Sequence, residues 1–212
     1  MEDNKNKKEA LLRSLSENGY NIGFGAKRHL KSYDILSMVP RLFSFIIICI
    51  GIIQMTNFYA KQFGKINDSI SAILIIAGII ALVADLSSEN KEDYNKKGII
   101  LIMLFNELRD MYNQVKKSDE NDLLISTEKR MREIVKEASK NSISNQIWFS
   151  NWLAHHSFFY ETQIDWINNE LQFKVWKDKI PATLKLFIFI ILLCIIAIVG
   201  NRICSAYSIK LF

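Results

Sequence analysis

The pattern of apolar and polar positions divides the chain into three apolar runs with charged segments between them. The runs are Leu42–Ala60, Ile70–Leu86 and Leu186–Gly200. A bilayer core about 30 Å thick needs roughly 20 helical residues, or about 17 at the short end. The first run is long enough and the second just qualifies. The third qualifies only when flanking residues from Ala182, with a snorkelling Lys185, are counted. The pattern predicts an all-α membrane protein with a transmembrane hairpin at 42–88 and a C-terminal transmembrane helix within 182–212.

The distribution of Lys and Arg around the apolar runs indicates how the chain is oriented in the membrane. Eight basic residues precede the first run and fourteen lie in 89–181, whereas the loop 61–69 holds two and the tail after Gly200 holds two. Basic segments beside a span tend to stay in the cytoplasm. The N-terminal segment 1–41 and the central region 89–181 are therefore predicted to be cytoplasmic, with the short loop and the tail outside.

The net charge of +5 is not evidence for nucleic-acid binding, because basic residues beside a membrane also suit anionic lipid. Basic residues beside a membrane favour anionic lipid by about 1 kcal/mol each near the surface. The basic segments have no interleaved aromatic residues and match no nucleic-acid-binding module, so direct nucleic-acid binding is not expected. Cysteines lie in or beside the apolar runs, without the spacing of a disulfide framework or a zinc site: Cys49, Cys194 and Cys204.

The central region 89–181 is predicted to be helical throughout. Apolar residues recur at helical spacing from Ile100 to Val115, and this helix is predicted to continue from the second span as a stalk. A second helix is predicted at about Ser126–Lys140, followed by a turn at 140–146. All four tryptophans lie within 148–176, and two interpretations of these aromatic residues stay open. They form a core between cytoplasmic helices, or an interfacial belt in front of the third run.

The segment before the first run has the pattern of an amphipathic helix. One helical stripe is formed by Ala26, Leu30, Tyr33 and Leu36 or Ser37. This helix is predicted to end before Pro40 and to lie on or just under the cytoplasmic leaflet, and Pro181 is predicted to mark a similar joint before the third run. Basic side chains predicted to contact the membrane surface or a partner are Lys27, Arg28, Lys31 and Arg41.

Polar and small residues inside the apolar runs are the candidate functional positions. Polar groups in hydrocarbon are costly, so they usually face a partner helix or water. A polar stripe on the outer half of the first span is formed by Gly51, Gln54 and Asn57, and Asp85 lies near the end of the second span. These residues are predicted to line a pore or to join helices; alternatively, Asn57 and Asp85 are only interfacial. Small residues that allow close helix packing are Ala77, Gly78, Ala81 and Ala84.

No residue pattern in the chain predicts catalysis. His155 and His156 are adjacent, so they point to different faces of a helix, and the HExxH zinc-protease pattern is absent. No nucleophile-elbow sequence is present. Gly23 and Gly25 lack the third glycine of a dinucleotide loop and the Gly-Lys-Ser/Thr of a P-loop, and are predicted instead to free the start of the basic helix. We expect no enzyme activity, no cofactor and no metal site.

The segment GAKRHLKSYD precedes the first span, the second span ends ALVADLSS, and the helix behind it carries Tyr94, Leu104, Leu108 and Tyr112. This order of elements resembles the SLATT family, two-transmembrane effectors of bacterial defence systems. The resemblance covers 18–118 well and 119–175 loosely, and it supplies no catalytic residues. It implies an inner-membrane protein that oligomerises and permeabilises the membrane when infection is sensed, found beside a nucleotide-signalling enzyme or a retron-type reverse transcriptase. The third run departs from this two-span pattern.

The predicted function is therefore a membrane effector of an anti-phage, abortive-infection system. A homo-oligomer would form a pore in the inner membrane or disrupt it, and so arrest growth or kill the cell. A hairpin of two helices is too thin to enclose a channel, so a pore requires several copies. The alternative is a non-conducting adaptor that docks a partner through its cytoplasmic helices.

Overall fold

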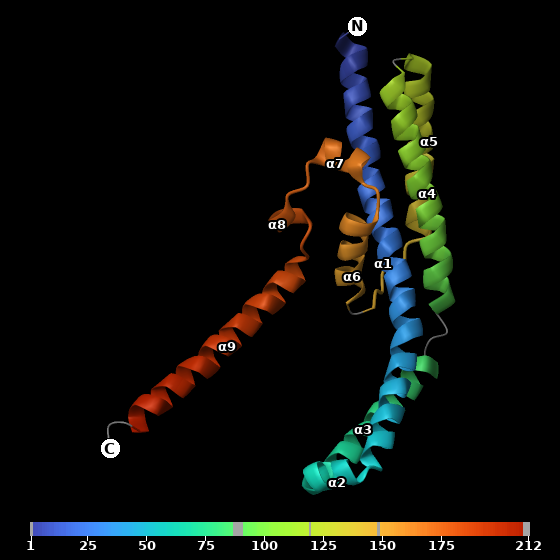
Figure 1. Cartoon of the computed structure of the whole chain (residues 1–212). Helices are drawn as coiled ribbons and strands as arrows, with labels where there is room; N and C mark the ends of the chain where they lie inside the picture. Colours follow the sequence, from blue (N-terminus) through green and yellow to red (C-terminus); the bar gives the residue numbers. More distant parts are fainter. Residues whose placement is uncertain (1, 87–90, 119, 148, 210–212) are drawn as a thin grey trace.

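The computed structural model describes residues 2–86, 91–118, 120–147 and 149–209. At 2–3, 60, 62, 65, 81–86 and 197–209 the description is of the backbone alone. All regular structure in this part of the chain is helical, which confirms the predicted all-α class. The helices, shown in Figure 1, are α1 (Glu2–Gln54), α2 (Asn57–Phe63), α3 (Asn67–Leu86), α4 (Lys91–Lys117), α5 (Asn121–Lys140), α6 (Ser150–His156), α7 (Asp165–Leu171), α8 (Val175–Asp178) and α9 (Ala182–Ile209).

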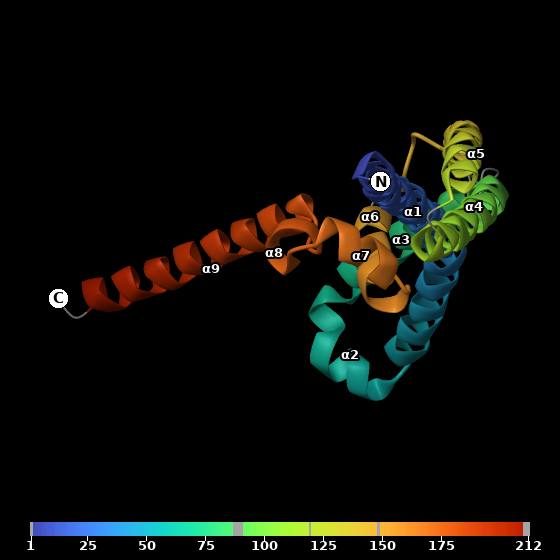
Figure 2. The ribbon, with the colours of Figure 1, turned by 90° about the horizontal axis from the view of Figure 1, so that it is seen from above.

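The N-terminal half of α1 packs with α4, α5, α6 and α7 into a helical body (Figures 1 and 2). Helix α4 presents an apolar stripe at helical spacing, which confirms the predicted periodicity, and α5 adds a narrower stripe. The large side chains that are almost wholly removed from solvent come from α1, α4, α5, α7 and the segment Ser157–Glu161 that follows α6: Leu15, Leu108, Tyr112, Val115, Ile134, Phe158 and Ile167.

Glycines set how closely α1 approaches its neighbours in the body. A Cβ on Gly19 would overlap the indole of Trp166, and one on Gly23 would lie 2.6 Å from the ring of Phe105. Both approaches are closer than van der Waals contact, so the aromatic rings occupy the space that a side chain would need. The prediction that Gly23 frees a helix start is wrong, because α1 runs through it without interruption.

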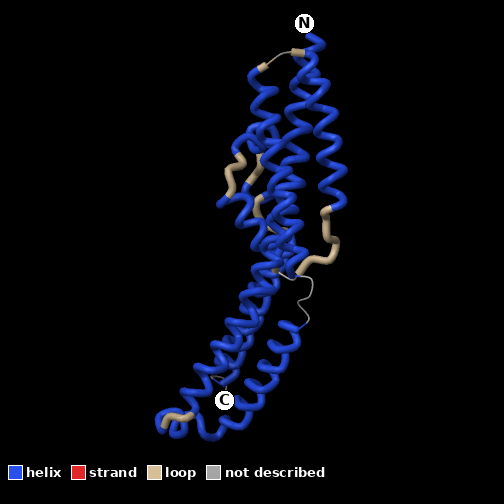
Figure 3. Tube along the Cα trace, turned by 90° about the vertical axis from the view of Figure 1, so that its right-hand side faces the viewer, coloured by secondary structure: helices blue, strands red, loops and turns tan. Residues whose placement is uncertain are grey.

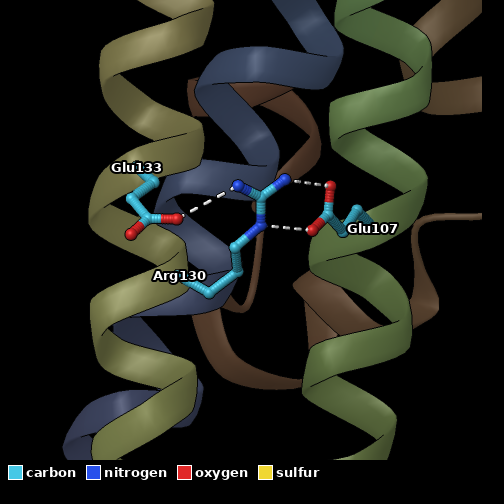
Figure 4. Close-up of polar contacts among 3 residues, drawn as sticks. All are labelled: Glu107, Arg130 and Glu133. Carbon is cyan, nitrogen blue, oxygen red and sulfur yellow. Dashed lines mark hydrogen bonds and ion pairs between the residues drawn. The ribbon is translucent and has the colours of Figure 1, made fainter.

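An ion pair joins the outer surfaces of α4 and α5. The guanidinium of Arg130 donates two hydrogen bonds to the carboxylate of Glu107, at 2.6 Å and 3.0 Å, and a third to Glu133 at 3.2 Å (Figure 4). Glu107 holds the pKa of Arg130 above its usual value. This bidentate contact fixes α5 against α4 at a point where both side chains remain partly exposed.

Helix α1 continues through Pro40, so the prediction of a joint at this proline is wrong. Residues on both sides of Pro40 are helical, and the C-terminal part of α1 bends, as a proline inside a helix commonly causes (Figures 1 and 3). The predicted amphipathic helix is correspondingly part of the body: Ala26 is fully buried and His29 almost so. It packs on protein and does not form a separate helix lying on the leaflet. The joint at Pro181 is confirmed, because α9 begins at Ala182.

The central region is helical only in part, which corrects the prediction of helix throughout. The turn predicted at 140–146 is present, but α5 begins at Asn121, and the chain from 141 to 147 is irregular. A π-helical turn, Ser157–Glu161, follows α6. The predicted stalk connection falls at 87–90, outside the described residues. Phe158, Phe159 and Trp166 are buried in the core of the body, as the first interpretation of the aromatic residues predicts, whereas Trp176 is exposed.

Candidate functional site

The three apolar segments extend from the body toward the same end of the molecule. In Figure 1 the C-terminal part of α1 and helix α3 lie together toward α2, whereas α9 runs obliquely away from them toward the same lower side of the view. Isoleucine, leucine and phenylalanine side chains are exposed along each of them, for example Phe45, Ile76 and Phe189. Among the described residues, α1 is the one helix long and apolar enough to cross a membrane, and Asn67–Ile80 and Ala182–Ile196 are shorter apolar stretches.

Helices α1 and α3 form a hairpin whose contact side carries small and polar residues. A Cβ on Gly78 would meet the side chain of Ile47 at 3.7 Å, so Gly78 faces α1, while its predicted role in packing membrane helices stays a prediction. Gln54 donates a hydrogen bond from Nε2 to the hydroxyl of Ser71 at 3.3 Å. The amide of Gln54 therefore has a partner on the opposite helix, which satisfies part of a polar group that would be costly in hydrocarbon.

The predicted polar stripe along the first span is interrupted. Helix α1 ends at Gln54, and Thr56 caps α2 by accepting a hydrogen bond from the backbone N–H of Tyr59. Asn57 consequently begins a different helix and is exposed, while a Cβ added at Gly51 would meet nothing within 4 Å. The first span therefore ends earlier than the apolar run suggests, since a threonine inside the run favours a cap.

The remaining predicted hairpin residues divide between the described and undescribed parts of the chain. Ala77 is half-buried beside Gly78. The side chains of Ala81, Ala84 and Asp85 lie outside the described residues, although the backbone of α3 continues to Leu86.

The basic residues predicted to contact the membrane surface or a partner lie at two places along α1. Arg41 is exposed where the apolar part of α1 begins. Lys27, Arg28 and Lys31 are half-buried on the body, where Lys31 pairs with Asp34 at 3.2 Å. Of these four residues only Arg41 is exposed, and their contact with the membrane surface or a partner stays a prediction.

Neither histidine of the adjacent pair belongs to a metal cluster among the described residues. His155 packs against the ring of Phe24 with centroids 4.7 Å apart, and His156 lies 3.3 Å from the carboxylate of Glu161. The two side chains point to different neighbours, as expected for consecutive positions on a helix.

A buried polar contact that the sequence analysis did not identify joins α1 to the irregular chain after α5. Nε2 of His29 accepts a hydrogen bond from the backbone N–H of Ile143 at 2.9 Å, so Nδ1 carries the proton and donates to the carbonyl of Gly25 at 2.8 Å. Burial lowers the pKa of His29, with Arg28 and Lys97 adding to this effect against the hydrogen bond to Gly25. The imidazole is therefore held neutral in the folded body.

Helix α9 is attached to the body through its first turns. The indole N–H of Trp152 on α6 donates to the hydroxyl of Thr183 at 2.8 Å, and its ring lies 5.5 Å from that of Phe187. Beyond this attachment α9 extends away from the hairpin (Figure 2). Its exposed side chains are apolar on all sides, which is typical of a helix surrounded by lipid or by other helices.

Comparison with protein-family models decides the family. The model described as SMODS and SLOG-associating 2TM effector domain 6, SLATT_6, matches residues 6–188. The chain belongs to the SLATT family. It is a membrane effector of anti-phage conflict systems, and this family is not a known enzyme family. The match covers the body and the hairpin and ends in the first turns of α9, so most of the third apolar helix lies beyond it. Comparisons with curated proteins and with solved structures gave no match.

Proposed function

We propose that this SLATT protein is an oligomeric effector that permeabilises the bacterial inner membrane and arrests growth. The observation that carries the proposal is the set of three apolar segments extending from one end of a folded polar body, with most of their large side chains exposed. A single α1–α3 hairpin encloses no channel. Several copies, packed through the small-residue and Gln54 side of the hairpin, would bury these surfaces and surround a pore.

The orientation proposed for this effector places the body in the cytoplasm and α2 outside. The charge distribution of the sequence supports it, since the body carries most of the Lys and Arg. An activating partner would then reach the body from the cytoplasm. The family description associates such domains with SMODS and SLOG proteins, and we propose a nucleotide-signalling enzyme, or a retron-type reverse transcriptase, as that partner.

Leakage of a dye from vesicles tests the proposed activity. The purified full chain, inserted into phosphatidylethanolamine and phosphatidylglycerol vesicles, is expected to release the dye, and its expression is expected to arrest growth. Gln54→Leu removes the polar group of the hairpin and is expected to change the leakage rate or its ion preference. Gln114→Leu, at an exposed position of α4, is the matched control and is expected to leave leakage unchanged. Vesicles that stay intact after confirmed insertion would contradict the proposal.

A second function, a non-conducting adaptor, is favoured by open grooves along the seam of α1 and α5. Cavities of about 410 Å³ and about 440 Å³ lie in line there, lined by residues such as Leu11, Ile125 and Val135. A groove with an apolar lining can accept the apolar face of an amphipathic partner helix. Expression without growth arrest, together with a stoichiometric co-purifying partner lost on Ile125→Glu, would favour the adaptor over the pore.

A further inference from the structure

Large apolar side chains are exposed where α6 and α8 meet the first turns of α9. Val175 and Trp176 of α8 are 55% and 77% exposed, and Phe149, which immediately precedes α6, is 57% exposed. Figures 1 and 2 both show α8 beside the start of α9. Tryptophan is highly buried on average in folded proteins, as Trp166 is in this body. Several such side chains left exposed at one junction indicate a surface that contacts something other than water.

The backbone of Phe149 holds this residue outside the core at a conformational cost. Its φ of 66° lies in the left-handed region, which bulky residues rarely adopt. The ring packs on that of Trp152, with centroids 5.1 Å apart, and stays largely exposed. Such strain is typical of functional positions, so an exposed aromatic residue in this conformation favours a binding surface.

Contacts join both α6 and α8 to the same turns of α9. The indole N–H of Trp152 donates to Thr183, and its ring lies 5.5 Å from that of Phe187. From α9, the Nζ of Lys185 donates to the backbone carbonyl of Lys177 on α8 at 3.5 Å. The exposed aromatic residues are therefore continuous with the first apolar side chains of α9.

Positive charge surrounds this junction. The segment from 174 to 185 holds one acidic residue, Asp178, and four lysines: Lys174, Lys177, Lys179 and Lys185. The carboxylate of Asp178 accepts a hydrogen bond from the backbone N–H of Lys174 at 2.9 Å, so it is engaged within α8. The side chain of Lys185 reaches back to α8, away from the apolar part of α9, as a lysine does at the edge of a bilayer. Lysines beside an apolar helix suit anionic lipid headgroups.

We propose that Phe149, Trp152, Val175 and Trp176, with the lysines of 174–185, form an interfacial surface that lies in the headgroup layer of an anionic bilayer. Tryptophan favours this layer because its ring is apolar and its N–H is polar. The surface would hold the body against the leaflet where α9 enters the membrane, and so fix the depth of α9. The inference rests on the proposed insertion of α9 and goes beyond pore formation, on which it does not depend.

The depth of single nitroxide labels in the full chain tests the interfacial surface. The three cysteines are replaced by alanine, and a label is attached to Val175→Cys on α8, Phe189→Cys on α9 or Ser126→Cys on α5, all at exposed positions. Electron paramagnetic resonance in phosphatidylethanolamine and phosphatidylglycerol nanodiscs measures collisions of each label with oxygen, which concentrates in the bilayer, and with a nickel chelate, which stays in water. The oxygen-to-nickel ratio is expected to be highest at Phe189, intermediate at Val175 and lowest at Ser126.

A second substitution in the Val175→Cys chain tests the role of the indole. Trp176→Ser is expected to lower the ratio toward that of the Ser126 label, because the apolar ring that holds α8 in the headgroup layer is lost. Met103→Ser, at a 65% exposed position of α4, is the matched control and is expected to leave the ratio unchanged. Replacing phosphatidylglycerol by phosphatidylcholine is expected to lower the ratio, since the lysines lose their anionic partners.

Each outcome of the labelling experiment decides the proposal. A Val175 label with the ratio of the Ser126 label, while the Phe189 label stays deep, would overturn the interfacial surface and leave α9 in the bilayer. A Val175 label that collides with neither reagent would show that protein covers this surface, and equal ratios in Trp176→Ser and Met103→Ser would remove the anchor; both overturn the proposal. A Phe189 label in water would contradict the insertion of α9 as well. Labels at their expected depths with no dye leakage would support the surface and contradict pore formation alone.

Discussion

The body and the three apolar segments use the same residue types in opposite ways. In the body, Phe158 and Leu108 are wholly removed from water, and glycines let α1 approach aromatic rings closely. In the hairpin and α9, phenylalanine and isoleucine side chains such as Phe45 and Ile196 stay about two-thirds exposed. Contiguous apolar surface of this extent marks a membrane or an association site. The body therefore holds its fold by internal packing, whereas the apolar segments require lipid or further copies.

The largest expected effect comes from emptying the aromatic core of the body. Phe158→Ala is expected to lower the free energy of unfolding by about 3–5 kcal/mol, because it leaves a cavity among Tyr20, Phe24 and Phe105. Trp176→Ala, at a 77% exposed position, is the control and is expected to change it by less than about 0.5 kcal/mol. Denaturant unfolding of the detergent-solubilised chain, followed by circular dichroism, measures both. Equal losses would show that the body lacks the core described.

Two glycines of α1, two residues apart, differ in how closely the rest of the body packs against them. Gly23→Ala is expected to lower the free energy of unfolding by about 1–3 kcal/mol, because the new Cβ would meet Phe105 at 2.6 Å. Gly25→Ala is expected to be neutral or to stabilise by up to about 1 kcal/mol, since its nearest neighbour is at 4.0 Å and alanine favours helix. The same unfolding measurement compares them. Stabilisation by both would mean that α1 does not approach the rings so closely.

The neutral imidazole of His29 predicts that the body loses stability in acid. Its pKa is lowered in the folded state, so the unfolded chain binds more protons once the pH falls below about 6.5. Stability is therefore complete above that pH and decreases as the pH falls through the folded pKa. His29→Gln, whose amide can still accept from Ile143, is expected to reduce the slope of the unfolding midpoint against pH.

His156→Gln is the control for this effect, because His156 is exposed and lies outside the buried contact. It is expected to keep the wild-type slope. His155, whose pKa is also lowered by burial, accounts for the slope that remains in His29→Gln. An unchanged slope after both His29→Gln and His155→Gln would exclude these groups as the source.

The smallest expected effect is on the surface contact between α4 and α5. Arg130→Lys keeps the charge but loses the bidentate contact with Glu107. It is expected to lower the free energy of unfolding by no more than about 1 kcal/mol, because both side chains are partly exposed. Arg132→Lys, whose partner Glu128 is on its own helix, is expected to be nearly neutral. A lower unfolding midpoint for Arg132→Lys than for Arg130→Lys would contradict the assignment of Arg130 to the helix seam.

Periodicity and apolar length predicted the helical class, the apolar stripe of α4 and the start of α9 after Pro181. They did not predict that α1 passes through Pro40, because the local preference of proline on its own predicts a helix boundary there. The sequence also placed Asn57 and Gln54 on one stripe, since a cap by Thr56 inside an apolar run gives no periodic signal. The hydrogen bond between His29 and Ile143 joins residues far apart in the chain, so no local sequence pattern predicts it.

Labelling of single cysteines from the two sides of the membrane tests the central claim most directly. In a chain with Cys49, Cys194 and Cys204 replaced by alanine, Ser126→Cys marks the body and Asp68→Cys marks the end of the hairpin near α2. An impermeant maleimide is expected to label Ser126→Cys only in inverted membrane vesicles and Asp68→Cys only in right-side-out vesicles. Labelling of both positions from the same side would contradict a hairpin that crosses the membrane.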